Sequence, residues 1–276
     1  ALSDLTGPEH QDIFPNLEIE QDAFLDKEAE FRSKEYKWPR DPLHNWARVW
    51  EYPYVYYHLA AYMKTLPQDY KPVVADVGSG VTFFPFSIAK LGYQVICTDI
   101  DPICERDLSL ARECVPHSPG TVDFRLAEGP AVPFGAEECD AVYCISVLEH
   151  VPDFEMMLVE ITRILKPGGL FILTCDINLR PEDGLELGPS AYQRLMNYVR
   201  KVYNPLWPEY TVHPADLLTT RNGPHPLAGS NYGVLPVARS FIKQKILKPL
   251  LGRKPGSIRT GPPHVAVQGL ALKKGR

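Results

Sequence analysis

Short apolar runs alternate with amphipathic segments between residues 72 and 176, and this alternation constrains the fold more than any other feature. We predict the runs to be β-strands, at residues 72–76, 94–98, 122–127, 141–146 and 170–174. We predict the main segments between them to be helices, at residues 83–91, 101–114 and 152–165. Strands separated by helices pair in parallel, and right-handed crossovers bring every strand-to-helix loop to one edge of the sheet. The sequence therefore predicts an α/β fold with helices on both faces of the sheet and a ligand site at that edge.

Less regular segments flank this alternating region. We expect residues 1–70 to form an N-terminal extension and residues 71–276 to form the main domain. Within the main domain, residues 177–236 are rich in Pro, Gly and Asn and are predicted to be an insertion, and residues 237–276 form a basic C-terminal part. Regular structure in the flanks is predicted as helices at 54–65 and 189–203, an amphipathic segment at 239–251 and a closing strand at 265–272.

The composition is that of a soluble globular protein with a sizeable core, at 45% hydrophobic and 23% charged residues. No apolar run is long enough to predict a transmembrane helix, and the N-terminus does not resemble a secretory signal. The six cysteines form no CxxC pair, so we expect reduced thiols buried in the core and no zinc site. Reduced thiols favour a cytoplasmic protein.

The net charge of −5 hides an asymmetry along the chain. No acidic residue follows Asp216, and the residues after it carry a charge of +11, against −16 for the residues up to it. A basic region of this kind either binds an anionic partner or complements the acidic part of its own chain. The sequence leaves both interpretations open.

The first predicted strand ends in the sequence Asp76-Val77-Gly78-Ser79-Gly80. Glycines let the backbone turn tightly and let a ligand approach the main chain, because they carry no Cβ atom. The start of the following helix offers free N–H groups to a carboxylate or a phosphate. Taken alone, this segment also fits an ordinary strand-to-helix turn.

Two acidic residues follow the next two predicted strands. Asp99 lies 19 positions after Gly80, where a carboxylate accepts hydrogen bonds from the hydroxyls of a ribose. Ile100 follows it and is expected to pack on the face of an adenine ring. Glu128 follows the third strand and is placed to accept a hydrogen bond from the adenine amino group. The plainer interpretations are a helix cap for Asp99, a role that Asp101 suits better, and a surface acid for Glu128.

A series of five segments resembles the motifs of class I methyltransferases, in the order ADVGSG, TDID, AEGPAVPF, DAVYCISVLEHVPD and ILKPGGLFILT. The resemblance covers residues 71–176 and is specific as a set, and it indicates a small-molecule type of methyltransferase. It implies a Rossmann-like sheet of seven strands, mostly parallel, with an antiparallel last strand for which residues 265–272 are the candidate. It also implies that S-adenosylmethionine is the cofactor.

The resemblance assigns roles to particular residues. It implies that Asp76 orders the glycine loop and that the cofactor lies over Gly78, Ser79, Gly80, Asp99, Ile100 and Glu128, with its methionine part beside Ile145 and Ser146. Many relatives have a third glycine where this chain has Thr82, which predicts a stiffer loop. Many have aspartate at the position of Glu128, a change that keeps the acceptor but lengthens it.

Two other functions compete with methyl transfer. A nicotinamide-dependent oxidoreductase needs a small residue at position 83 to bring helix and strand close together, and this chain has Phe83 there. A relative that binds the cofactor or a partner without turnover is the second alternative. The intact series of glycines and acids argues against it.

Methyl transfer is an in-line displacement at a sulfonium, so the protein mainly has to position the acceptor. A hydroxyl acceptor also needs a base, and His150 is the leading candidate because it follows the fourth strand at the expected edge of the site. Glu149 is the second candidate. A histidine at this place also fits a helix cap or a packing role. Asp176 and Asn178 are the only hint of a magnesium site, and we predict no metal.

Aromatic residues are dense between residues 38 and 62, just ahead of the first strand. Because aromatic faces attract cations and exclude water, we expect a helical lid over the cofactor and the acceptor, formed by Trp46, Trp50, Tyr54 and Tyr57. The plainer alternative is a helix packed on the sheet. Residues 177–236 would form the other wall of the acceptor site.

The acceptor is expected to be a small organic molecule methylated on oxygen or nitrogen, with an anionic or carrier-bound molecule as one option. The acidic total charge argues against a nucleic acid, and no segment predicts stable membrane insertion. The basic C-terminal part keeps RNA and a lipid-like molecule open as alternative acceptors. The sequence does not indicate the oligomeric state.

Overall fold

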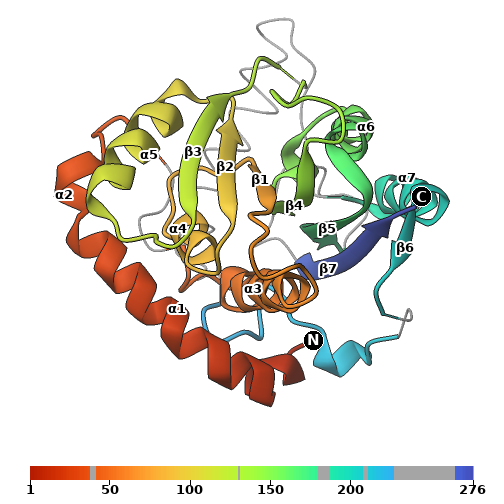
Figure 1. Ribbon diagram of the computed structural model, residues 1–276. Coiled ribbons are helices and arrows are strands. Elements are labelled where there is room, and N and C mark those ends of the chain that lie inside the picture. Colours follow the sequence, from red (N-terminus) through yellow and green to blue (C-terminus); the bar gives the residue numbers. More distant parts are fainter. Residues whose placement is uncertain (38–41, 130, 180–186, 208–210, 227–264, 276) are drawn as a thin grey trace, which may run out of the picture.

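The computed structural model describes residues 1–37, 42–129, 131–179, 187–207, 211–226 and 265–275. These residues include a seven-stranded sheet in the order β3-β2-β1-β4-β5-β7-β6 (Figure 1). The strands are β1 (Val73–Val77), β2 (Gln94–Asp99), β3 (Thr121–Leu126), β4 (Cys139–Ile145), β5 (Leu165–Asn178), β6 (Tyr203–Pro205) and β7 (Val265–Lys274).

Strands β1 to β5 pair in parallel, and β7 runs antiparallel to both β5 and β6. The predicted Rossmann-like sheet with an antiparallel last strand is therefore confirmed. Strand β6 was not expected, because three residues that end in Pro205 carry no recognisable strand pattern. Proline is tolerated there because β6 lies at the edge of the sheet.

The helices are α1 (Pro8–Asp26), α2 (Glu28–Phe31), α3 (Arg48–Met63), α4 (Phe84–Ala89), α5 (Pro102–Cys114), α6 (Phe154–Ile164) and α7 (Pro189–Val202), with 3₁₀ turns η1 (Ser3–Thr6), η2 (Leu148–His150) and η3 (Pro214–Asp216). The sequence explains two of the helix starts. The carboxylate of Asp101 accepts from the N–H of Ile103 and caps α5, and that of Asp153 accepts from the N–H of Met156 and caps α6.

Each face of the sheet carries its own hydrophobic core. Side chains alternate between the two faces along a strand, so Val74 and Ala141 join the core that also holds residues of α1 to α5. Their neighbours Ala75 and Val142 join the core that holds residues of α6 and α7 (Figure 1). Burial on both faces explains why these strands read as continuous apolar runs.

Helix α3 begins six residues earlier than predicted and contains Pro53. Proline has no N–H to donate to the carbonyl one turn before it, which here is that of Val49. His10 of α1 supplies the missing donor, with its Nε2 at 2.8 Å from the Val49 oxygen. Helix α3 packs against α1, α4 and strands β4, β5 and β7. The N-terminal helices thus share a core with the main sheet, and the proposed domain boundary at residue 70 stays a prediction.

Strand β5 is longer than predicted at both ends. Its start pairs with Cys139 of β4, a register shift follows, and Leu170 then pairs with Ala141. Its far end pairs with β7 as far as Asn178. Pairing with strands on both sides extends β5 beyond the apolar run that marks it in the sequence.

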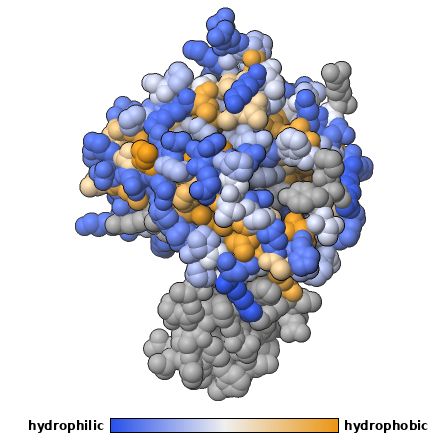
Figure 2. All heavy atoms as spheres, turned by 90° about the horizontal axis from the view of Figure 1, so that it is seen from below, coloured by the Kyte–Doolittle hydropathy of each residue, from blue (hydrophilic) through white to orange (hydrophobic). Residues whose placement is uncertain are grey.

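Hydrophilic residues cover most of the face drawn in Figure 2, and apolar residues show only as small patches between them. Among the described residues, no helix combines the length and the apolar character needed to cross a membrane. All six cysteines lie in the described part and are free thiols, and five of them are buried, as expected. The amphipathic segment predicted at 239–251 lies outside the described residues.

Candidate functional site

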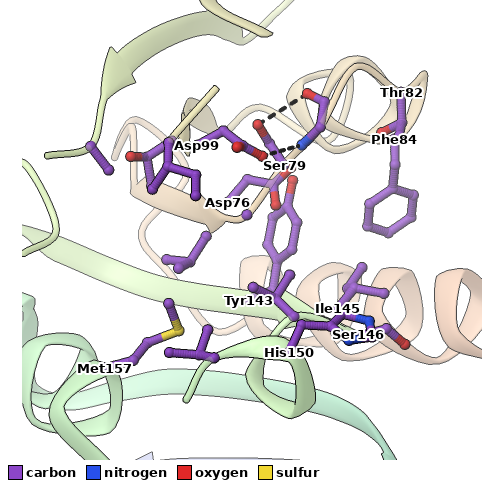
Figure 3. Close-up of a pocket in the computed structure, with 18 of the residues that line it drawn as sticks. Asp76, Ser79, Thr82, Phe84, Asp99, Tyr143, Ile145, Ser146, His150 and Met157 are labelled. Atoms are coloured by element: carbon purple, nitrogen blue, oxygen red, sulfur yellow. Dashed lines mark hydrogen bonds between the residues drawn. The ribbon is translucent and has the colours of Figure 1, made fainter. Parts of the chain in front are cut away.

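A pocket of about 380 Å³ opens where β1, β2 and β4 end, at the edge predicted from the topology (Figure 3). Its size is in the range of small-molecule and cofactor sites. Nine of the residues predicted at the site line it, namely Asp76, Gly78, Ser79, Gly80, Asp99, Ile100, Ile145, Ser146 and His150. The structure thus brings together residues that are up to 74 positions apart in the sequence.

The glycine loop forms the floor between β1 and α4. Gly78 and Gly80 have φ of +76° and +54°, a backbone conformation that side chains disfavour. The N–H groups of Gly78 and Ser79 both donate to the carbonyl of Thr98, at 2.8 and 3.2 Å. A Cβ atom on Gly78 would lie 2.4 Å from Cγ2 of Val147, so the loop after β4 reaches the glycine loop only because a glycine is there.

Asp99 ties the end of β2 to the glycine loop. One of its carboxylate oxygens accepts from the N–H of Gly80 at 3.0 Å, and the other accepts from the N–H of Asp101 at 3.1 Å. Next to it, the side chain of Ile100 lines the pocket and is 71% exposed. A carboxylate beside an exposed apolar side chain suits a ligand with hydroxyl groups attached to a flat apolar ring.

Asp76 lies at the base of the pocket and is only 5% exposed. Burial raises the pKa of its carboxyl to about 8, and the charge of Asp99 contributes to that rise. The neighbouring Tyr143 hydroxyl acts in the opposite direction and lowers the pKa of Asp76. The carboxyl therefore holds a proton at neutral pH more readily than an ordinary aspartate does.

His150 and Glu149, the two predicted bases, point in different directions. Both lie in η2, and adjacent side chains of a 3₁₀ turn diverge by about 120°. His150 is exposed and lines the pocket. Glu149 does not line the pocket and is 7% exposed, and its role as a base stays a prediction. It accepts from the N–H of Asp176 at 3.0 Å, and burial raises its pKa to about 7.

Glu128 also lies differently from the prediction. Its neighbours Ala127 and Gly129 line the pocket, whereas the Glu128 side chain is exposed and does not. The loop is therefore at the pocket, and a contact between Glu128 and a ligand stays a prediction.

The aromatic residues predicted as a lid do not line the pocket, and a lid over a bound ligand stays a prediction. Trp50 stacks on Tyr54, with ring centroids 4.6 Å apart, and both rings pack over Gly269 of β7. Trp46 packs against Val265 of the same strand, and Tyr57 lies against the ring of His58. This part of α3 is a helix packed on the sheet, and its aromatic rings fill space over β7.

Other residues of the N-terminal region reach the pocket instead, and the sequence did not single them out. Tyr36, Arg48 and Tyr52 all line it. The hydroxyl of Tyr36 accepts from the N–H of Val81 at 2.8 Å, which holds the tyrosine over the glycine loop. For Arg48, the sequence offered one clue. Its charge is opposite to that of Glu51, which lies one helical turn later in an otherwise aromatic segment.

Arg48 and Glu51 form an ion pair that reaches the end of β4. Glu51 is fully buried, and Nη1 of Arg48 donates both to its carboxylate and to the hydroxyl of Ser146, the latter at 2.6 Å. The Ser146 hydroxyl donates to the other Glu51 oxygen at 2.7 Å. Burial alone would lower the pKa of Arg48, but the Glu51 carboxylate more than offsets this and the pKa is raised. Arg48 therefore stays charged.

The described residues contain no group of three or more His, Cys, Asp or Glu side chains arranged to hold a metal ion. Asp176 and Asn178, the pair considered for magnesium, lie at the end of β5. Asp176 is half-buried and Asn178 is buried. Neither lines the pocket.

Two solved structures are similar to this chain over most of its length, at low sequence identity. The YcgJ protein from Bacillus subtilis matches with a TM-score of 0.47 and 16% identity, over 80% of this chain and 99% of that one. A putative sarcosine dimethylglycine methyltransferase from Galdieria sulphuraria matches with a TM-score of 0.49 and 17% identity, over 80% of this chain and 86% of that one. Likeness at this level carries no argument about function.

Sequence relatives are more informative. An uncharacterized methyltransferase of Mycobacterium leprae is 34% identical over 133 residues, which are 47% of this chain and 48% of the relative. An uncharacterized methyltransferase of Mycobacterium tuberculosis is 33% identical over 134 residues, which are 47% of this chain and 51% of the relative. The chain thus spans about half the length of the curated relatives it matches.

The family model described as a methyltransferase domain matches residues 75–173. This range runs from β1 to β5 and contains the glycine loop, Asp99 and the loop after β4. It coincides with the segments whose motifs resemble class I methyltransferases. The chain therefore contains a class I methyltransferase domain, of the kind whose cofactor is S-adenosylmethionine.

Proposed function

We propose that this protein transfers a methyl group from S-adenosylmethionine to a small organic acceptor, on oxygen or nitrogen. The observation that carries the proposal is the convergence of the loops after β1, β2 and β4 on one pocket, in the domain that matches methyltransferases. The cofactor, when bound, supplies a methyl group on a positively charged sulfur. Everything else needed is binding and orientation by the chain's own residues.

The adenosine end of the cofactor fits the part of the pocket around β2. Asp99 offers a carboxylate to ribose hydroxyls, and Ile100 offers an exposed apolar face to the adenine ring. The glycine loop lets the ligand approach the main chain closely, since both glycines lack a Cβ atom. Glu128 lies in the next loop and is the proposed partner of the adenine amino group.

The methionine end fits the part of the pocket formed by β4 and the N-terminal region. Ile145 and Ser146 lie at the end of β4, and Tyr36 and Tyr52 line the same space. Aromatic faces attract a sulfonium cation and keep water away from it. The side chain of Tyr52 is buried, and burial raises its pKa, so it remains neutral.

The acceptor is proposed to be small because the pocket of about 380 Å³ must hold it together with the cofactor. His150 is proposed as the base, because it is the one histidine among the described residues that line the pocket. An acceptor is first identified by the transfer of a labelled methyl group to it. The turnover rate of His150→Gln with that acceptor is then compared with that of the wild type as a function of pH. A turnover rate unchanged at every pH would rule out His150 as the base.

The charge of the chain leaves room for an anionic or carrier-bound acceptor. The residues after Asp216 carry a charge of +11, and Arg221, Lys273 and Lys274 belong to the described part. RNA and a lipid-like molecule are the alternative acceptors for this basic part. Activity that does not change between low and high salt would count against any electrostatic role for it.

Isothermal titration calorimetry tests the proposal directly. We expect S-adenosylmethionine and S-adenosylhomocysteine to bind and NAD⁺ not to bind. Asp99→Ala should weaken S-adenosylhomocysteine binding by at least about tenfold, since loss of a charged hydrogen-bond acceptor costs roughly 1.5–3 kcal/mol. Asp123→Ala, in an exposed position on β3, is the control and should bind as the wild type does. Binding of NAD⁺ alone would identify a dinucleotide enzyme instead.

A further inference from the structure

Ser146 has an unusual backbone conformation at the edge of the pocket. Its φ is +48°, in the left-handed region that residues other than glycine, asparagine and aspartate seldom adopt. Residues in such conformations persist only where their surroundings hold them, and they gather at functional sites. The interactions that hold Ser146 in this conformation therefore bear on how the site works.

The surroundings of Ser146 fix both its backbone and its side chain. Its N–H donates to the carbonyl of Thr174 in β5 at 3.0 Å. Its hydroxyl donates to Glu51 at 2.7 Å and accepts from Arg48 at 2.6 Å. Since Arg48 and Glu51 are also paired with each other, three side chains form a closed, charge-assisted network between α3 and β4.

The residue after Ser146 transmits this conformation to the glycine loop. Val147 lines the pocket and packs so closely on Gly78 that a Cβ atom there would lie 2.4 Å from it. A change in the φ of Ser146 redirects the chain at Val147 and alters this contact. The distance between the loops after β1 and β4 therefore depends on the conformation of Ser146.

We propose that Arg48 and Glu51 are positioning residues, which hold Ser146 in its left-handed conformation so that Val147 fixes the glycine loop for the cofactor. This inference rests on the proposed function of the pocket. It also gives Ser146 another role than the direct cofactor contact expected from the sequence. Its hydroxyl has a single proton, which it donates to Glu51, so it has none to donate to a ligand.

Two substitutions of Ser146 separate positioning from direct contact. Ser146→Ala and Ser146→Gly both remove the hydroxyl, but only glycine adopts a φ of +48° without strain. Measured by calorimetry, S-adenosylhomocysteine should bind about tenfold more weakly to Ser146→Ala than to Ser146→Gly. An equal loss in both variants would show that the hydroxyl itself contacts the ligand and would overturn the proposal. So would wild-type affinity in both.

The double-mutant cycle of Glu51 with Ser146 tests the network itself. Glu51→Gln keeps the shape of the side chain and removes the charge that holds Arg48. It should weaken S-adenosylhomocysteine binding severalfold in the wild-type background. It should weaken binding much less in the Ser146→Gly background, because glycine adopts the left-handed conformation without the support of Arg48 and Glu51. Equal losses in the two backgrounds would contradict the positioning role. Glu113→Gln, on the exposed side of α5, is the control.

Thermal unfolding keeps the inference separable from the proposed function. If the wild-type protein does not bind S-adenosylhomocysteine, the proposed function fails, and the backbone strain is then read from stability alone. Ser146→Gly should in that case unfold at a higher temperature than Ser146→Ala, since glycine adopts this φ without strain and alanine does not. Equal unfolding temperatures would overturn the positioning role as well.

Discussion

Gly78 is under two separate constraints, one on its backbone and one on the space around it. Its φ of +76° disfavours any side chain, and Val147 occupies the space that a Cβ atom would need. Gly129, at φ +72° in the loop after β3, has the first constraint only, because no atom lies within 4 Å of the position of its Cβ. The two glycines therefore allow strain and collision to be measured apart.

Gly78→Ala should lower the free energy of unfolding by about 2–4 kcal/mol, the sum of backbone strain and overpacking. Gly129→Ala should cost only the strain, about 1–2 kcal/mol. Urea unfolding of the two variants and the wild type measures the difference. Equal losses would mean that Val147 moves aside without cost and does not fix the glycine loop.

The carboxyl of Asp76 makes stability depend on pH. Its pKa is raised by burial from 3.8 to about 8, so between these pH values the folded protein holds a proton that the unfolded chain has lost. The free energy of unfolding contributed by this group is complete below pH 3.8 and is lost as the pH rises through about 8. Glu149, with its pKa raised to about 7, acts in the same direction.

Asp76→Asn should therefore lose less stability than the wild type between pH 5 and about 8, because asparagine does not ionise. Urea unfolding at the two pH values measures this difference. Asp69→Asn, at an exposed position before β1, is the control and should follow the wild-type slope. A wild-type slope in Asp76→Asn would show that Asp76 ionises in the folded protein as it does in the unfolded chain.

At the scale of elements, α3 connects the pocket to the antiparallel strand. Tyr52 lines the pocket, whereas Trp50 and Tyr54 lie over β7. The hydrophobic pattern of α3 does not distinguish these directions, because the helix carries aromatic residues nearly all round. Trp50 and Tyr54 contact β7 at Gly269, where a Cβ atom would lie 2.5 Å from the Trp50 ring.

Gly269→Ala should destabilise the protein by about 1–3 kcal/mol, because the added methyl group forces α3 away from β7. Its affinity for S-adenosylhomocysteine, measured by calorimetry at a temperature where the variant is folded, should stay within about threefold of wild type, since the contact lies outside the pocket. Gly188→Ala, where nothing lies within 4 Å, is the matched control. A large loss of affinity would mean that the position of α3 on β7 controls the pocket.

For the whole molecule, the pocket joins parts that fold from distant segments. Tyr36, Arg48 and Tyr52 come from the N-terminal region, and most of the other lining residues lie at the carboxyl ends of β1, β2 and β4 or in the loops that follow β1 to β4. An unfolded chain cannot assemble such a site, so a ligand binds only the folded state. Binding must therefore raise the stability of the entire protein.

S-adenosylhomocysteine at one hundred times its dissociation constant should raise the free energy of unfolding by about 2.7 kcal/mol, and NAD⁺ at the same concentration should not change it. Thermal unfolding with each ligand measures the effect. A rise with NAD⁺ and none with S-adenosylhomocysteine would contradict the proposed cofactor.

The sequence by itself determined the main sheet and the edge of it at which the pocket opens. The predictions of the strands, of the glycine turn at Gly78 and Gly80 and of the acid at Asp99 rest on local features. These features are the pattern of apolar residues, the backbone conformation that glycine allows, and short spacings along the chain. The rules of parallel crossovers then place these loops at one edge, whatever the rest of the chain does. For the same reason, these predictions agree with the structure.

Only the tertiary structure decided which side chains turn toward the pocket. It turns His150 toward the pocket and buries Glu149, and it lines the pocket with Tyr36, Arg48 and Tyr52. The network of Arg48, Glu51 and Ser146 joins residues up to 98 positions apart. Such choices depend on helix rotation and on packing between distant segments, which hydrophobic pattern and local propensity do not encode.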